Sequence, residues 1–412
     1  MLETISIRNF KSIREVILMD LPSLAVFFGP NAAGKSNLLD AIQALSRIGT
    51  SRTLGEALQE PIRGYPIESF SFPPGGLPAL LAMNQPEFEI GARLRVEKEG
   101  FDYRVAVRID PKSGGLSVAN EFLAALTSTG GVKGNALIER QDDQLRIRRK
   151  SKPAHPRQEP TGLNHSLLSD PRLSGVEYRG LERCRRELQR WRTYYLDPRV
   201  SMRRATPPAE VEDIGVLGED IAPFLYRLRA EKESEFKSVV RTLRTLVPSV
   251  EDVTVDLDKR RGTLDIVIRQ DGVEYSSRIV SEGTLRLLAL CALAVNPWGG
   301  SLLAFEEPEN GVHPRRLELI AELLTSLALE QGRQVFVTSH SLPFCSTVFR
   351  MQKKHPEEIG LFRVRQDMGA TEIDRFETPG DLFTDSDILR ALSEPTEESV
   401  LEGPLMRGFA DG

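Results

Sequence analysis

Residues 27–36 read Phe-Phe-Gly-Pro-Asn-Ala-Ala-Gly-Lys-Ser, and the interpretation of the whole chain starts from this stretch. It follows an apolar run, Leu24 to Phe28, that is typical of a buried strand. It leads into residues 37–48, whose composition favours a helix. The spacing G-x-x-x-x-G-K-S between a strand and a helix is that of a phosphate-binding loop. The sequence therefore predicts a triphosphate site near the start of the chain.

Each residue type in this loop has a physical reason. Gly29 and Gly34 permit the backbone conformations and the close approach that turn successive N–H groups towards a triphosphate. Lys35 supplies a positive charge for the outer phosphates, and Ser36 supplies a hydroxyl group for Mg²⁺. The residues that we expect at the nucleotide are Asn31, Ala32, Ala33, Gly34, Lys35, Ser36 and Asn37. The alternative is a glycine-rich turn that binds no ligand.

A second cluster lies at residues 301–308, which read Ser-Leu-Leu-Ala-Phe-Glu-Glu-Pro and form an apolar strand that ends in two carboxylates. Side chains alternate along a strand, so Glu306 and Glu307 are expected on opposite sides of it. We assign Glu306, together with Ser36, to the metal, and Glu307 to the attacking water. A strand that simply ends in solvated acids is the alternative.

Two further loops carry candidate residues. Ser281, Glu282 and Gly283 open a strongly apolar helix, and a Ser-x-Gly loop at a helix N-terminus can bind a second anion. An ordinary N-cap serine is the alternative interpretation of Ser281. His340 follows the apolar strand Gln334 to Val337, where it could donate to a γ-phosphate. The alternative there is a loop histidine with a local partner.

The stretches GPNAAGKS, SEGT, LLAFEEPENGVHP and VFVTSHS occur in this order in the chain. They resemble the Walker A, signature, Walker B with D-loop, and H-loop motifs of the RecF, SMC and overcoming-lysogeny-defect group of ABC-type ATPases. Within that group the chain looks like the PtuA-like AAA-family ATPases that lack a nuclease domain. The resemblance implies an α/β fold: an ABC-type P-loop head with an antiparallel β lobe, a mixed central sheet and a helical subdomain carrying a basic insertion.

The resemblance also implies how two copies combine. Lys35 and Ser36 of one copy would hold ATP with Mg²⁺, and Ser281 and Gly283 of another copy would close over it in a head-to-tail homodimer. There are departures from the family pattern, because SEGT replaces the LSGGQ of transporters and Glu306 stands where Asp is usual. The glutamine loop of such ATPases has three candidates, Gln85, Gln141 and Gln144.

Composition points to a globular protein of the cytoplasm. The chain has 412 residues, of which 40% are hydrophobic, and no apolar run approaches about 18 residues. The N-terminus lacks the plan of a secretion signal. The three cysteines are far apart in the sequence, which predicts buried free thiols in a reducing compartment. We therefore expect a cytoplasmic location and no membrane partner.

The net charge of -5 hides an asymmetry. Residues 133–204 contain 18 Lys and Arg against 9 Asp and Glu. A basic excess of this kind is typical of a surface that meets a polyanion, so DNA is a candidate partner of this region. Arg183, Arg186 and Arg190 would share one face of a helix. The alternative is a solvated face in which these arginines form salt bridges.

We divide the chain into four parts: an N-terminal ATPase lobe with Walker A (1–110), a basic insertion (111–205), a helical subdomain (206–250), and a C-terminal ATPase lobe with signature, Walker B, D-loop and H-loop (251–412). The elements that we expect are strands in 2–22, a hairpin over 88–110, mostly loop over 111–175, a helix over 176–195, two packed helices before residue 248, three strands over 250–280, and a hairpin over 359–376.

The C-terminal segment bears on the function. About 70 residues follow His340, too few for the Toprim nuclease domain that some members of the group carry. The acids there are expected to be solvated: Asp381, Asp385, Asp387, Glu394, Glu397 and Glu398. We therefore expect a slow ATPase that dimerises on ATP and regulates a separately encoded effector, a nuclease, in bacterial anti-phage defence. The alternatives are a RecF-like DNA-binding ATPase of DNA repair or chromosome maintenance, and the ATPase subunit of a transporter.

Overall fold

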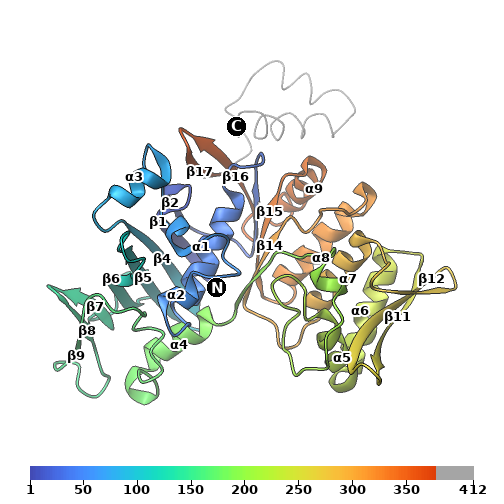
Figure 1. The fold of residues 1–412 in the computed structure, drawn as a ribbon, viewed down its shortest axis with the longest axis horizontal. Coiled ribbons are helices and arrows are strands. Elements are labelled where there is room, and N and C mark those ends of the chain that lie inside the picture. Colours follow the sequence, from blue (N-terminus) through green and yellow to red (C-terminus); the bar gives the residue numbers. More distant parts are fainter. Residues whose placement is uncertain (377–412) are drawn as a thin grey trace.

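The structure is a computed structural model that describes residues 1–376, so the acids Asp381, Asp385, Asp387, Glu394, Glu397 and Glu398 lie outside the described residues. Its centre is a six-stranded sheet with the order β10–β14–β15–β3–β16–β17. These strands are β10 (Trp191–Tyr194), β14 (Leu302–Glu306), β15 (Gln334–Ser339), β3 (Leu24–Phe28), β16 (Ile359–Asp367) and β17 (Ala370–Arg375). They pair in parallel except for β17. Figure 1 shows this sheet between two halves of the molecule.

β3 is buried along its whole length because both faces of the central sheet are covered. Ala25 and Phe27 belong to the hydrophobic core on one side of the sheet. Leu24, Val26 and Phe28 belong to the core on the other side. The phosphate-binding loop therefore leaves a strand that is fixed from both faces, at the carboxyl edge where neighbouring parallel strands also end.

One half of the molecule is built on an eight-stranded antiparallel sheet with the order β2–β1–β4–β5–β6–β7–β8–β9. The strands are β1 (Leu2–Phe10), β2 (Ile13–Leu18), β4 (Glu87–Val96), β5 (Glu99–Ile109), β6 (Leu116–Leu126), β7 (Ile138–Gln141), β8 (Gln144–Ile147) and β9 (Arg157–Pro160). Helix α1 (Lys35–Ile48) contacts strands of both sheets, and α2 (Leu54–Ala57) and α3 (Gly76–Ala82) lie in the same half (Figure 1). The strands expected in 2–22 and the hairpin expected over 88–110 are confirmed.

The expectation that residues 111–175 are mostly loop is wrong for β6, which pairs with β5 along its length. Glu121 interrupts the apolar pattern of β6, which hid this strand from sequence analysis. Its carboxylate is fully buried and accepts hydrogen bonds from the Ser166 hydroxyl at 2.6 Å and the Leu167 N–H at 2.7 Å. Burial raises the pKa of this carboxyl group, and these hydrogen bonds act against that rise.

The helix expected over 176–195 is shorter in the structure. Helix α4 (Arg179–Leu188) ends three residues before β10, which pairs in parallel with β14. Aromatic side chains favour strands, and the buried Tyr194 ring stacks on the Phe305 ring at a centroid distance of 5.2 Å. The segment therefore divides between a helix of one half and the edge of the central sheet.

The other half contains the two packed helices expected before residue 248, α5 (Ile221–Glu231) and α6 (Glu233–Leu246). A three-stranded sheet follows, made of β11 (Val250–Asp258), β12 (Thr263–Gln270) and β13 (Val273–Ser276). The last strand is shorter than expected, because the chain turns after Ser276 and the Ile279 N–H donates to the Ser276 carbonyl oxygen. Helices α7 (Glu282–Ala294), α8 (Leu317–Leu329) and α9 (Leu342–Gln352) complete this half.

All three cysteines are free and buried, as expected. No helix within residues 1–376 is both long and apolar enough to cross a membrane.

Candidate nucleotide site

The phosphate-binding loop leaves β3 at Phe28 and becomes α1 at Lys35. Ala32 (φ +66°) and Gly34 (φ +99°) both have left-handed backbone conformations within it. Gly34 is the N-cap residue of α1 and has no side chain with which to cap the helix. The first N–H groups of α1 therefore suit an external acceptor, and an anion at a helix N-terminus is such an acceptor.

Lys35 is 6% exposed, and its ammonium group donates to the carbonyl oxygens of Gly29 and Pro30, both at 2.9 Å. Burial lowers the pKa of Lys35, and nearby acidic groups, Glu307 first among them, act in the opposite direction. A buried cation requires a compensating charge. A phosphate bound in this loop would supply that charge, so the environment of Lys35 fits a nucleotide.

Ser36 and Glu306 meet although they are 270 positions apart in the sequence, and the Ser36 hydroxyl donates to the Glu306 carboxylate. Glu306 is the last residue of β14, which is separated from β3 by β15. Hydroxyl and carboxylate oxygens are hard ligands of the kind that Mg²⁺ prefers. These two side chains therefore fit a magnesium ion at the outer phosphates.

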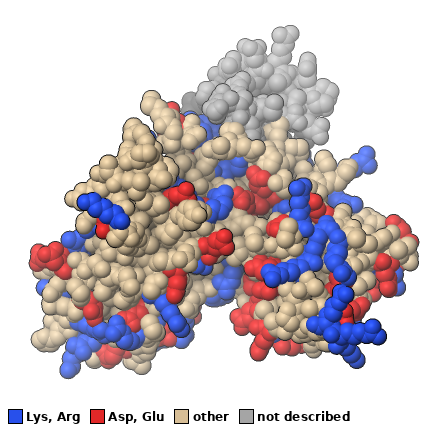
Figure 2. Space-filling model, in the orientation of Figure 1, with Lys and Arg blue, Asp and Glu red and all other residues tan. Residues whose placement is uncertain are grey.

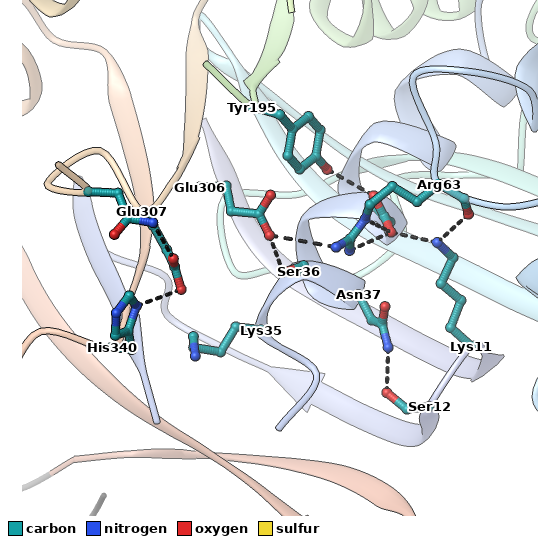
Figure 3. Close-up of polar contacts among 12 residues, drawn as sticks. Lys11, Ser12, Lys35, Ser36, Asn37, Arg63, Tyr195, Glu306, Glu307 and His340 are labelled. Carbon is teal, nitrogen blue, oxygen red and sulfur yellow. Dashed lines mark hydrogen bonds and ion pairs between the residues drawn. The ribbon is translucent and has the colours of Figure 1, made fainter. Parts of the chain in front are cut away.

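Glu307 lies just past the end of β14 in a left-handed conformation (φ +44°). One of its carboxylate oxygens is 2.8 Å from Nδ1 of His340. The other accepts a hydrogen bond from the Asn310 amide at 2.9 Å. Figure 3 shows the carboxylate of Glu307 directed to His340, whereas that of Glu306 is directed to Ser36. The two neighbouring acids therefore have separate partners and can have separate roles.

Sequence analysis missed a charge network that extends from Glu306 to the interior of α1. Asp40 is completely buried and accepts hydrogen bonds from Lys11 at 2.5 Å, Arg63 at 2.8 Å and the Tyr195 hydroxyl at 2.8 Å. Arg63 is also 3.6 Å from the Glu306 carboxylate (Figure 3), so it contacts both acids. The available signal was one acidic residue within an apolar helical stretch, since such a residue needs partners.

The loop of residues 281–283 has the geometry of a helix cap. Ser281 is the N-cap residue of α7, and its hydroxyl oxygen accepts a hydrogen bond from the Thr284 N–H at 3.2 Å. A Cβ at Gly283 would lie 2.6 Å from the carbonyl oxygen of Gly311, so only glycine fits there. Within residues 1–376, no hydrogen bond or ion pair joins this loop to Lys35. Within the described residues, the two predicted halves of the site are therefore not joined by a polar contact.

Two arginines hold this loop from outside. Arg203 donates to the carbonyl oxygen of Val280 at 2.8 Å, and Arg199 donates to the Glu282 carboxylate at 2.9 Å. Both arginines belong to the basic stretch 133–204 for which DNA was the candidate partner. Part of that positive charge therefore supports the conformation of a neighbouring loop.

Helix α4 carries Arg183 and Arg186, but Arg190 lies beyond its end at Leu188, so the expectation that all three arginines share one helix face is wrong for Arg190. Arg183 pairs with Glu99 at 2.6 Å, and Arg186 pairs with Glu182 one turn earlier. Figure 2 shows Lys and Arg interspersed with Asp and Glu over the visible face of this half. These pairs correspond to the salt-bridged helix face that was the alternative interpretation, and contact with DNA stays a prediction.

The glutamine candidates lie apart from these contacts. Gln85 precedes β4, Gln141 ends β7, and Gln144 begins β8. No hydrogen bond within the described residues joins any of them to Ser36 or Glu306. The glutamine loop stays unassigned.

Comparison with known proteins identifies one family. The profile of the family described as "AAA domain, putative AbiEii toxin, Type IV TA system" matches residues 24–345. The match begins at β3 and ends within α9, so it includes the phosphate-binding loop, the loop at 281–283 and both acids of β14. No curated protein matches the chain.

Solved structures similar to the chain include SMC heads. A crystal structure of the SmcHead bound to the C-winged helix domain of ScpA has a TM-score of 0.51 at 13% identity, and the match covers 92% of this chain and 98% of that one. The SMC head domain from Thermotoga maritima has a TM-score of 0.40 at 14% identity (92% and 99% covered). The Smc head domain with an extended coiled coil bound to the C-terminal domain of ScpA, from Pyrococcus furiosus, has a TM-score of 0.45 at 12% identity. That match covers 95% of this chain and 99% of that one. The first of these shows that the chain has the fold of an SMC head, which confirms the predicted fold class.

Proposed function

The chain belongs to the AAA-domain family described above, and on that premise we propose that it is an ATPase whose two copies close head to tail over ATP and Mg²⁺. The observation that carries this proposal is the convergence of three groups at one edge of the central sheet. Lys35 lies at the start of α1, the Ser36–Glu306 contact lies beside it, and the Glu307–His340 pair lies on its other side (Figure 3). Such a convergence suits a triphosphate, a divalent metal and a water.

Separate residues of this site would bind the phosphates, hold the metal and activate the water. The loop residues 31–37 and Lys35 would bind the phosphates, and Ser36 and Glu306 would hold Mg²⁺. The metal would supply positive charge that neutralises the outer phosphate oxygens. Glu307 would orient a water and accept its proton as the water attacks the γ-phosphorus, which releases ADP and phosphate.

His340 and Asn310 would keep the Glu307 carboxylate in place, because each contacts one of its oxygens in the structure. The direct donation from His340 to the γ-phosphate that the sequence suggested is a further role for the same side chain. It is compatible with the first, since a histidine has two ring nitrogens.

The second copy would complete the site through Ser281, Glu282 and Gly283. The support is that residues 281–283 form a cap at the N-terminus of α7, held by Arg199 and Arg203, yet no hydrogen bond or ion pair joins them to Lys35 of their own chain within residues 1–376. A helix N-terminus attracts an anion, so this loop suits the γ-phosphate bound by another copy.

Replacing Ser281 with arginine tests the shared site. The bulky side chain would block closure, so we expect ATP-dependent dimers to disappear in light scattering while the Kd of the monomer for ATP stays within about twofold of wild type. The control is Ser234→Arg on the exposed side of α6, which should dimerise normally. Dimers of Ser281→Arg as abundant as those of wild type would contradict the shared site.

For the biological setting, we propose that ATP-driven closure signals to a separately encoded nuclease in bacterial anti-phage defence, as in the PtuA-like group. The family description, a putative toxin of a type IV toxin–antitoxin system, supports a role in defence or growth control. Purified protein that cut DNA by itself would contradict the need for a separate effector.

A further inference from the structure

The glycines of the phosphate-binding loop are packed against the C-terminal hairpin formed by β16 and β17. A Cβ at Gly29 would lie 2.0 Å from the carbonyl oxygen of Val364 in β16. A Cβ at Gly34 would lie 2.0 Å from Oγ1 of Thr371 in β17. The hairpin thus touches the loop at both of the positions where the motif has glycine, although more than 300 residues separate them in the sequence.

A chain of hydrogen bonds fixes this contact. Oγ1 of Thr371 donates to the carbonyl oxygen of Ala33 in the loop at 3.0 Å. The same oxygen is 2.6 Å from the Ser12 hydroxyl in the β1–β2 turn. Ser12 in turn accepts from the amide of Asn37 on α1 at 2.6 Å. The backbone joins too, because the Thr371 N–H donates to the Ser12 carbonyl oxygen at 2.9 Å.

The direction of these bonds follows from the number of protons. A hydroxyl group has one proton to donate. Thr371 gives its proton to Ala33, so Ser12 must give its own to Thr371, and the Ser12 oxygen is then free to accept from Asn37. The result is a closed ring that begins and ends on the loop–α1 segment and passes through the hairpin and the β1–β2 turn.

We propose that Thr371 is a positioning residue for nucleotide binding, which holds the loop in its phosphate-binding conformation from the side opposite the nucleotide. This inference rests on the proposed function. Thr371 is 1% exposed, so its hydroxyl acts on Ala33 and Ser12 and does not reach a ligand through solvent. The loop needs such support, because Ala32 and Gly34 are both left-handed, a conformation that Ala32 adopts only at a cost.

The inference requires that the hairpin and the bound nucleotide stabilise each other. If the hairpin stabilises the binding conformation of the loop, bound nucleotide must stabilise the hairpin by the same factor. A residue that only supported the fold would change the stability of the protein without responding to ATP. The amide N–H of Thr371 is a direct reporter of this coupling, since it donates to the carbonyl oxygen of Ser12, a member of the ring.

The test compares three variants in full-length protein. Thr371→Val keeps the shape but removes the hydroxyl, and it leaves the Ala33 carbonyl and the Ser12 proton without their partner. We expect its Kd for ATP, measured by calorimetry, to rise about 5- to 30-fold, with kcat at saturating ATP within about twofold. Thr371→Ser keeps the hydroxyl and should bind within about threefold of wild type. The matched control is Thr347→Val, which removes a buried hydroxyl that donates to the Pro343 carbonyl within α9.

Hydrogen exchange supplies the second measurement. ATP should slow exchange of the residue 371 amide in wild type, and this effect should be lost in Thr371→Val. Ser12→Ala, which cuts the same ring at another point, should weaken ATP binding in the same direction and serves if Thr371→Val does not fold. ATP binding within about twofold of wild type in Thr371→Val and Ser12→Ala, or equal weakening in Thr347→Val, would overturn the inference.

Lys35→Ala, measured in parallel, distinguishes failure of the positioning role of Thr371 from failure of the proposed function. If Lys35→Ala abolishes ATP binding while Thr371→Val and Ser12→Ala bind like wild type, the positioning role fails and the proposed function stands. If wild type itself does not bind ATP, both fail.

Discussion

Replacing Lys35 with alanine is expected to weaken ATP binding at least about 100-fold, because charge-assisted bonds to two phosphates are lost. The fold should not suffer. The ammonium group is buried against two carbonyl oxygens, and burial lowers its pKa, so the cation contributes little to the stability of the ligand-free protein. We expect the free energy of unfolding without nucleotide to fall by less than about 1 kcal/mol.

Thermal unfolding with and without ATP measures both effects. A ligand at 100 times its Kd raises the free energy of unfolding by about 2.7 kcal/mol, and Lys35→Ala should lose this gain at the same ATP concentration. Lys353→Ala is the control, because that lysine is exposed and lies over the Phe349 ring in α9. A Lys35→Ala protein that ATP still stabilises like wild type would show that the loop does not bind the triphosphate as we describe.

Replacing Glu307 with glutamine is expected to lower ATP turnover about 10²- to 10³-fold, because the amide cannot accept a proton from the attacking water. ATP binding should persist, since Glu307 contacts His340 and Asn310 and glutamine has nearly the same shape. The variant should therefore accumulate as an ATP-bound dimer, visible in light scattering when Mg²⁺ and ATP are present. Turnover like that of wild type would remove Glu307 from the reaction.

The neighbouring acid provides a matched comparison. Glu306→Gln removes a negative charge from the Ser36 contact, so it should raise the Mg²⁺ concentration needed for ATP binding. Glu307→Gln should leave that concentration unchanged. If the two variants, or Glu307→Gln and Lys35→Ala, behaved alike in a nucleotide-binding assay, the division of roles would be wrong.

Local patterns explain how much of the fold was predictable. The strand–loop–helix around Lys35 and the strand ending at Glu306 each occupy one continuous stretch, in which periodicity and motif spacing point to the same answer. The two helices before residue 248 and the hairpin over 359–376 were predicted for the same reason. Elements were missed where tertiary contacts oppose the pattern, as at Glu121, where a buried carboxylate with partners 45 and 46 positions away stands in a core strand.

The site itself was predictable only in its motifs. Asp40 accepts hydrogen bonds from residues 29 positions before it, 23 after it and 155 after it. The sequence around Asp40 does not predict which residues these partners are. Thr371 lies 338 positions from the loop carbonyl that it contacts. Such contacts follow from how the sheets are assembled, which single-sequence periodicity does not specify. The arginines of the basic stretch 133–204 show a limit of composition as evidence. Their number suggested a polyanion as partner, but Arg183 and Arg203 have partners within the chain.

The most direct test of the central claim mixes two inactive proteins. Lys35→Ala lacks the phosphate-binding half, and Ser281→Arg lacks the closing half. In a head-to-tail pair of one of each, one of the two sites is built from the intact halves of both chains. Mixing equal amounts should therefore restore ATP hydrolysis above the level of either variant alone, since each mixed pair has one complete site and its arginine faces only the Lys35→Ala loop, which holds no nucleotide. A mixture that hydrolyses no more ATP than the two variants do separately would contradict a site shared between two copies.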